Sequence, residues 1–265
     1  MSTKAIGLDI GSQTTKAVIL DGNEILSSTI TQSQDDPESS AKAAVEQVLG
    51  QVSSGSSNDL FITSTGIGGK SITLNQQHKG ITTCLARGVH HLFPSAQMVI
   101  DMGAESGTVL RINERGRLSD WATHDKCAAG TGIFLQQMAK LMQMSLEEMS
   151  EISYQAKSKA DISSTCAVFA ESEVISHVHR VPPTPREDIA AGIYYSVVSR
   201  TVTLCKRVGI KEDIAAVGGV ALNKGLLHIL EKEIGSKILV PDTPQIAAAL
   251  GAAIISQENI EKGAL

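Results

Sequence analysis

The amino-acid sequence predicts an α/β protein built from two similar halves. An apolar strand that ends in an Asp-x-Gly turn occurs twice, at Asp9-Ile10-Gly11 and, 92 residues later, at Asp101-Met102-Gly103. Each turn is followed by another strand and a hairpin turn, and segments with helical periodicity lie between and after them. This repeated order indicates a duplicated α/β unit.

The strands follow the same order in both halves. In the first half we expect an apolar strand from Ala5 into the Asp9 turn, a strand over residues 16–20, a hairpin turn at Asp21-Gly22 and a strand over residues 24–30. In the second half we expect strands over residues 98–102, 108–112 and 117–121, with a turn over residues 113–116.

The spacing of apolar residues predicts helices in the remaining segments. Phe134, Met138, Leu141 and Met142 recur at helical intervals, and a helix over about residues 223–234 ends at Gly235. Thr184-Pro185-Arg186-Glu187 predicts a capping box with Pro at the first helical position. It opens a long helix with an apolar stripe of Ile189, Ile193, Val197, Leu204 and Val208.

Composition excludes several classes of protein. Hydrophobic residues make up 42% of the 265 residues and charged residues 19%, which excludes a disordered chain. The net charge of −5 does not fit a nucleic-acid-binding protein. The longest apolar run, residues 246–255, is too short to span a bilayer, and no secretory signal is visible. We therefore expect a cytoplasmic protein whose cysteines form no disulfides.

Three glycine turns favour nucleotide binding. Asp9 and the residues up to Lys16 place a carboxylate beside a small-residue turn, which offers N–H groups and hydroxyls to phosphates while the Asp holds hydrated Mg²⁺. One such motif is more often an ordinary hairpin. The second Asp-x-Gly turn and Gly218-Gly219 before a helix, in this order, favour the nucleotide site.

These turns resemble the phosphate and adenosine motifs of the acetate/sugar kinase–Hsp70–actin superfamily. The resemblance implies two ribonuclease-H-like lobes, an actin-like ATPase fold, with ATP/ADP and Mg²⁺ in the cleft. The lobes would be residues 1–96 and 97–265, with the last helix, about residues 243–257, packing back on the N-terminal lobe. Asp9 and Asp101 would hold Mg²⁺ through water and, with Glu105, form the catalytic set. The implied nucleotide contacts are Gly11, Ser12, Gln13, Lys16, Gly103, Ala104, Gly218, Gly219, Asn223 and Gln245.

Two of the four cysteines open predicted helices. Cys127 precedes the Phe134 helix and Cys166 starts another, so each thiol lies where the helix dipole and free N–H groups favour a thiolate. Buried, inert thiols are the alternative. Two thiolates do not complete a four-thiolate iron–sulfur cluster, but two copies of the chain do if these helix ends meet across a two-fold axis. Cys84 and Cys205 are expected to be packing residues.

The two cysteine motifs, Asp125 to Gly132 and Ser163 to Glu173, resemble the BadF/BadG/BcrA/BcrD-type ATPases. This family activates 2-hydroxyacyl-CoA dehydratases and drives benzoyl-CoA reductases. The resemblance runs from Asp9 to Ala253. It implies an oxygen-sensitive homodimer with one 4Fe–4S cluster, held by Cys127 and Cys166 of both copies. Ferredoxin or flavodoxin would reduce it, and ATP hydrolysis would drive single electrons to a CoA-thioester dehydratase or reductase.

The second phosphate loop departs from the family pattern. The family's Asp-Ile-Gly-Gly-Gln-Asp is replaced by Asp101 to Ser106, with Glu105 and Ser106 in place of the Gln and Asp. We therefore expect slow hydrolysis. Thr65 to Lys70 departs as well, and both changes resemble the benzoyl-CoA reductase ATPase that pairs with a different, related ATPase. A heterodimer is thus the alternative to the homodimer.

Two other functions stay open at the level of sequence. One is a small-molecule kinase of the same superfamily without a cluster, although no residue is indicated as its base. The other is a nucleotide-sensing scaffold without turnover. ATP turnover distinguishes the scaffold from the other two functions, and iron content distinguishes the activator from both alternatives.

Overall fold

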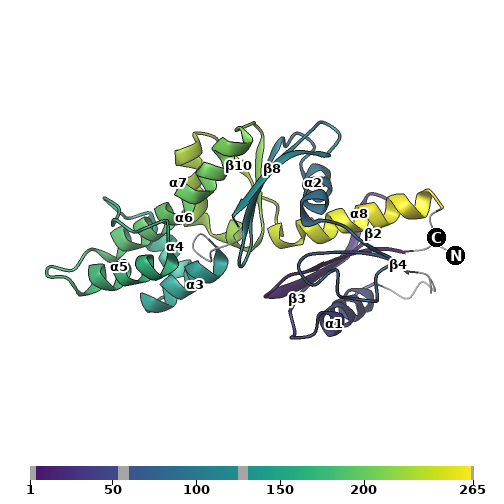
Figure 1. Ribbon diagram of the computed structural model, residues 1–265, viewed down its shortest axis with the longest axis horizontal. Helices are drawn as coiled ribbons and strands as arrows, with labels where there is room; N and C mark the ends of the chain where they lie inside the picture. The colour runs from purple at the N-terminus through teal and green to yellow at the C-terminus, as the bar shows by residue number, and fades with distance from the viewer. Residues whose placement is uncertain (1–3, 53–59, 125–130, 264–265) are drawn as a thin grey trace. The chain divides into compact units, whose positions relative to one another are not determined.

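The computed structural model describes residues 4–52, 60–124 and 131–263. The chain divides into two compact units (Figure 1). Unit 1 contains Met1–Ala96, Ile112–Ser119 and Pro241–Leu265, and unit 2 contains Gln97–Arg111 and Asp120–Val240. The C-terminal segment therefore belongs to the same unit as the first 96 residues.

The first sheet has five strands in the order β3-β2-β1-β4-β5. Strand β1 is antiparallel to β2 and parallel to β4, and its Asp9 lies opposite Lys16 on β2 and Thr65 on β4. Gly22, with φ of 58°, makes the predicted hairpin turn between β2 and β3. The strands are β1 (Lys4–Ile10), β2 (Thr14–Asp21), β3 (Glu24–Gln32), β4 (Leu60–Thr65) and β5 (Gln77–His78).

The second sheet repeats this connectivity, in the order β10-β9-β6-β7-β8. Strand β6 is antiparallel to β7 and parallel to β9, and Asp101 occupies the place that Asp9 has in β1. The predicted duplicated α/β unit is therefore confirmed. The strands are β6 (Met98–Met102), β7 (Gly107–Ile112), β8 (Leu118–His124), β9 (Ile214–Val217) and β10 (Ile238–Leu239).

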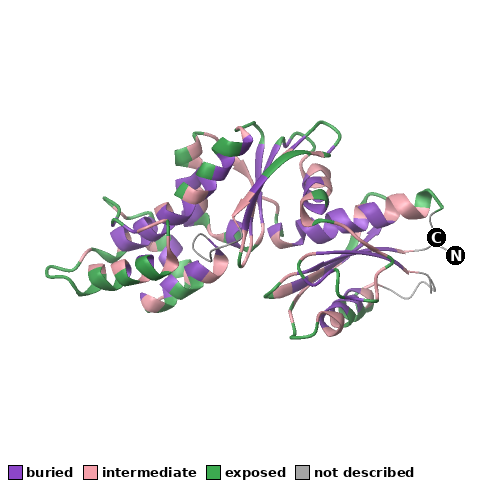
Figure 2. Ribbon diagram, in the orientation of Figure 1, coloured by how far each residue is buried: buried purple, intermediate pink, exposed green. Residues whose placement is uncertain are grey.

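Helices cover both faces of the first sheet, with α1 (Pro37–Gly50) and α8 (Ala247–Glu261) on opposite sides (Figure 1). Alternation along the strands explains this arrangement. Ile6, Leu8 and Ile10 of β1 pack in the cluster that contains α1, whereas Ala5 packs with α8. Both faces are consequently buried (Figure 2).

Helix α8 approaches its neighbours unusually closely. A Cβ atom at Gly7 of β1 would overlap the Ala249 carbonyl oxygen of α8, and one at Gly251 of α8 would overlap the Cys84 carbonyl oxygen of α2 (Ile81–Leu92). Ser256 adds a buried hydrogen bond, because its hydroxyl donates to the Ile6 carbonyl at 2.9 Å. Backbone contact through glycine thus joins α8 to the sheet and to α2.

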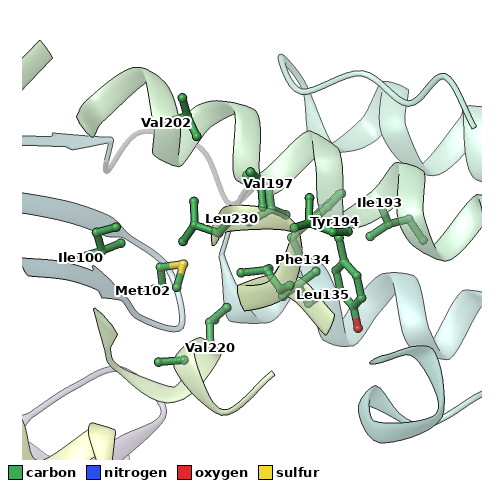
Figure 3. Close-up of a cluster of buried hydrophobic side chains, with 14 of the residues drawn as sticks. Ile100, Met102, Phe134, Leu135, Ile193, Tyr194, Val197, Val202, Val220 and Leu230 are labelled. Carbon is green, nitrogen blue, oxygen red and sulfur yellow. The ribbon is translucent and has the colours of Figure 1, made fainter. Parts of the chain in front are cut away.

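The main core of unit 2 lies between one face of the second sheet and its helices (Figure 3). Ile100 and Met102 of β6 point toward Phe134, Tyr194 and Leu230 from three different helices. The predicted apolar stripe of the long helix is buried throughout. The helices are α3 (Gly132–Leu141), α4 (Leu146–Ser153), α5 (Ala167–His179), α6 (Arg186–Val208) and α7 (Lys224–Ile234).

Two predicted helix starts are wrong. Thr184 does not cap α6, whose N-cap is Pro185 without a side-chain hydrogen bond. The Thr184 backbone and side chain instead bind His177, through the His177 carbonyl at 3.1 Å and Nδ1 at 2.9 Å. The last helix, expected over about residues 243–257, begins as a 3₁₀ turn, η2 (Pro244–Ile246), and continues as α8 to Glu261.

Within the described residues, no helix is both long enough and apolar enough to cross a bilayer. The ten-residue apolar run noted in the sequence forms the end of η2 and the first part of α8, and it is buried against the first sheet.

The glycine contacts of α8 predict a stability effect. Gly251→Ala should lower the free energy of unfolding by about 3 kcal/mol or more, because the new methyl group meets backbone that has no room to move. Urea unfolding followed by circular dichroism measures the change. Gly50→Ala is the matched control, since a Cβ at Gly50 meets nothing within 4 Å. Equal stability of the two variants would contradict the close approach of α2 and α8.

Candidate functional site

The first Asp turn is held by a short network at the end of β1. The Gly11 N–H donates to the Thr14 carbonyl at 3.1 Å and closes the turn. Lys16 Nζ lies 3.1 Å from Asp9 Oδ2 and donates to the Thr14 carbonyl at 3.2 Å. Asp9 is buried, and the ion pair neutralises its charge. Ser12 and Gln13 are exposed at the tip of the turn.

The second Asp turn has the same geometry. The Gly103 N–H donates to the Ser106 carbonyl at 2.9 Å, as Gly11 does to Thr14. Glu105 is exposed at the tip, where Gln13 stands in the first turn. The repeated hydrogen bond makes the two turns structural equivalents, as the repeated Asp-x-Gly pattern predicts.

The start of α3 binds directly to the second turn. The N–H groups of Gly132 and Ile133 donate to the carbonyls of Gly103 and Ala104, each at 3.0 Å. These first-turn N–H groups have no acceptor within their own helix. Helix α3, which follows the Cys127 segment in sequence, is thereby attached to the second phosphate loop.

A left-handed glycine lies beside each carboxylate. Gly66 after β4 has φ of 84°, and Gly218 after β9 has φ of 85°. A Cβ at Gly66 would lie 2.6 Å from Asp9 Oδ1, and one at Gly218 would lie 2.7 Å from Asp101 Oδ1. Both positions therefore require glycine for space as well as for conformation. The sequence predicted Gly218 as a site residue, whereas Gly66 was noted only within the divergent Thr65–Lys70 segment.

Asn223 and Gln245 are placed differently from each other. The Asn223 side chain caps α7 by accepting the Leu226 N–H at 3.0 Å and donates to the Tyr194 hydroxyl at 2.9 Å. Burial raises the pKa of Tyr194 to about 12, so this phenol stays protonated. Asn223 thus holds the end of η1 (Gly219–Leu222), the turn that contains Gly219. Gln245 is partly buried in η2 of unit 1.

The cysteines fall into two environments. Cys84 and Cys205 are fully buried within helices, and burial raises the pKa of each thiol to about 12. Cys166 is only partly buried and is the N-cap of α5, where no side chain makes a capping hydrogen bond. Cys127 lies outside the described residues.

The Cys166 environment suits an anionic sulfur ligand. The first N–H groups of α5 lack intrahelical acceptors and point beyond the helix start, which stabilises negative charge there. In the part of the chain that the structure describes, no group of three or more His, Cys, Asp or Glu side chains could hold a metal ion. One chain's described residues therefore offer a single accessible thiolate, and a four-thiolate cluster would need Cys127 and a second copy.

Exposed apolar residues accompany Cys166. Val168 and Phe169, in the first turn of α5, are 67% and 63% exposed. Large apolar side chains this accessible beside a ligand-like thiol are typical of a surface that another protein covers.

The duplicated sheets and their carboxylate-glycine turns define an ATPase-like protein of the actin-like fold. The chain belongs to the BadF/BadG/BcrA/BcrD ATPase family, whose profile matches residues 6–256. It is 39% identical to a 2-hydroxyisocaproyl-CoA dehydratase activator of Clostridioides difficile, over 97% of this chain and 96% of that protein. It is 35% identical to the (R)-2-hydroxyglutaryl-CoA dehydratase activating ATPase of Acidaminococcus fermentans, over 99% and 100%.

Solved structures agree with this assignment. The activator of the 2-hydroxyisocaproyl-CoA dehydratase from Clostridium difficile with bound ADPNP superposes with a TM-score of 0.90 at 37% identity, covering 98% of this chain and 97% of that one. A ROK family glucokinase from Streptomyces griseus has a TM-score of 0.55 at 12% identity, over 96% and 99%, and shares the fold alone. A component of the benzoyl-CoA reductase of Thauera aromatica is a 33% identical relative, over 98% and 95%.

The two thiol environments predict different reactivities. In the iron-free protein at pH 8, iodoacetamide should label Cys84 and Cys205 at least about 100-fold more slowly than Cys166, because thiols with a pKa of about 12 are almost wholly protonated. Labelling of the two buried thiols should rise as pH approaches 12. Mass spectrometry of digested peptides reads each site, and protein unfolded in guanidinium is the control. Comparable labelling of Cys84 in the folded protein would refute its burial.

Proposed function

We propose that this protein is an ATP-dependent activator that passes low-potential electrons to a 2-hydroxyacyl-CoA dehydratase or a benzoyl-CoA reductase-type partner. The electrons would come from a 4Fe–4S cluster bridging two copies of the chain. The observation that carries the proposal is Cys166, an accessible thiol at an uncapped helix N-terminus. It occurs in a chain that belongs to a family with named dehydratase activators.

The nucleotide part of the proposal assigns roles to both Asp turns. Asp9 and Asp101 hold Mg²⁺ through water, and Lys16 exchanges part of its contact with Asp9 for a phosphate oxygen. Glu105 orients the attacking water in place of the family's Gln. The remaining contacts to phosphates and nucleoside come from Gly11, Ser12, Gln13, Gly103, Ala104, Gly218, Gly219, Asn223 and Gln245.

In the cluster part, Cys127 and Cys166 of each copy supply four thiolates. The cluster, when bound, supplies one electron at low potential. The N-terminus of α5 stabilises the negative charge of Cys166, and Val168 and Phe169 form the apolar rim that the second copy covers. A homodimer is the simplest assembly that completes the ligand set. A heterodimer with a related ATPase chain is the alternative, which the similarity to the Thauera aromatica reductase component supports.

Nucleotide state is coupled to the cluster through α3 in this proposal. Gly103 and Ala104 line the second phosphate loop, and their carbonyls hold the first N–H groups of α3. A change of phosphate contacts there shifts the population of α3 positions, and with it the chain segment that precedes Thr131. Ferredoxin or flavodoxin would supply the electrons, and the acceptor would be a CoA-thioester dehydratase or reductase.

A small-molecule kinase is the second candidate function. The glucokinase similarity supports only the shared fold. A kinase would bind ATP through the same turns but would hold no iron, so metal content distinguishes the two functions.

Iron content tests the proposal. After anaerobic purification, the wild-type protein should hold about two irons and two sulfides per chain in a dimer, because four irons are shared by two copies. Cys166→Ala and Cys127→Ala should each lose the iron, whereas Cys205→Ala, a change in the buried core, should keep it. Colorimetric iron and sulfide assays with light scattering measure both quantities. A Cys127→Ala protein that retains its iron would eliminate the bridging cluster.

Lys16 tests the nucleotide site. Lys16→Ala should weaken MgATP binding by about 10- to 100-fold, since a charge-assisted contact to phosphate is lost. Lys42→Ala on α1 is the matched control, because Lys42 forms a surface ion pair with Glu38 at 3.6 Å. Isothermal titration calorimetry gives both dissociation constants. Equal affinities of the two variants would remove Lys16 from the phosphate site.

A further inference from the structure

The turn before Cys166 is tied to a side chain within the helix that Cys166 begins. Glu173, in the second turn of α5, reaches back so that its Oε2 accepts the Ser163 N–H at 2.5 Å. Ser163 Oγ in turn accepts the Thr165 N–H at 3.2 Å. These two hydrogen bonds connect Glu173 to the residue directly before Cys166.

This contact differs from the ordinary use of an acidic residue near a helix start. A carboxylate that only complements the helix dipole lies in the first turn and faces solvent. Glu173 instead captures a backbone N–H ten residues earlier in the chain and is partly buried while doing so. Hydrogen bonds from a backbone N–H to a carboxylate are stronger than those to a neutral acceptor.

The same loop is anchored independently at its other end. Asp188, in the first turn of α6, accepts the N–H groups of Lys157 and Ser158 at 3.0 and 3.1 Å, and the Ser158 hydroxyl at 2.8 Å. Burial opposes the charge of Asp188, but these hydrogen bonds outweigh it and hold the pKa of the carboxyl below its ordinary value. With Asp188 holding the beginning of the loop, Glu173 is the contact that determines where its last residues lie.

We propose that Glu173 is a positioning residue for Cys166. Through Ser163 and Thr165, its carboxylate holds the Ser163–Thr165 turn in one conformation, so that the Cys166 sulfur is presented at a defined place beyond the start of α5. This role rests on the proposed function, because the defined sulfur position is what a shared four-thiolate cluster requires.

The acceptor role distinguishes two substitutions at this site. The amide oxygen of Gln accepts the Ser163 N–H as the carboxylate does, so E173Q keeps the geometry and removes only the charge. E173L removes the acceptor altogether. E171L is the matched control, since Glu171 lies two residues earlier on α5 and its replacement changes charge and size by the same amount.

Hydrogen exchange tests the contact in the full-length, iron-free protein. Exchange at the Ser163 amide should be about tenfold or more faster in E173L than in the wild type, the loss expected for a hydrogen bond to a charged group. E173Q should stay within about threefold of the wild type, and E171L should be unchanged. Should E173L unfold, E173A replaces it. Equal protection of Ser163 in the Glu173 variant and E171L would overturn the proposal.

The anaerobic, iron-loaded protein gives the second readout. E173L should release iron to a chelator about tenfold faster than the wild type and change the electron paramagnetic resonance spectrum of the reduced protein, with both properties restored in E173Q. An E173L protein with wild-type iron retention and spectrum would overturn the role at the cluster. If the wild type binds no iron, the proposed function fails, whereas the exchange experiment still decides whether Glu173 holds the turn.

Discussion

The first unit depends on one constraint, the contact of α8 with β1 and α2 at backbone distance. Gly7, Gly88 and Gly251 make this contact possible, because a Cβ at any of them would overlap backbone of the neighbouring element. The contact brings the last residues of the chain onto the sheet whose central strand ends at Asp9. The buried Ser256 hydroxyl, bonded to Ile6, fixes the position of α8 along that strand. The first phosphate turn is therefore supported by residues from both ends of the chain.

The duplicated sheets place the same small device at two strand ends. Each device has a carboxylate after the central strand, a turn closed by one backbone hydrogen bond, and a left-handed glycine on the parallel neighbour. The glycine leaves the carboxylate room that any side chain would fill. The second device is also bonded to a helix start, through Gly132 and Ile133. The two halves thus share their geometry but differ in what a change at the turn reaches.

The cysteines show how one residue type takes opposite roles in one fold. Cys84 and Cys205 lie on buried helix faces, where the high cost of a charged sulfur keeps the thiol protonated. Cys166 stands at a helix start with unsatisfied N–H groups, and its preceding loop is held on α6 by Asp188 and on α5 by Glu173. Such anchoring gives a loop residue the precision that a shared ligand set needs.

The sequence by itself determined the strands, the hairpin turns, both Asp-x-Gly loops and the buried stripe of α6, because these depend on local patterns of polarity and on glycine at turns. It also pointed to Cys166 through the residues around it. Only the tertiary structure decided which partner each polar side chain takes. Thr184 binds His177 instead of capping α6, Asn223 spends its side chain on α7 and Tyr194, and Glu173 turns back to Ser163. The glycine contacts of α8 belong to the same class, since they join residues more than 150 positions apart. Local sequence carries no record of such distances, and the packing of complete elements is what brings these groups together.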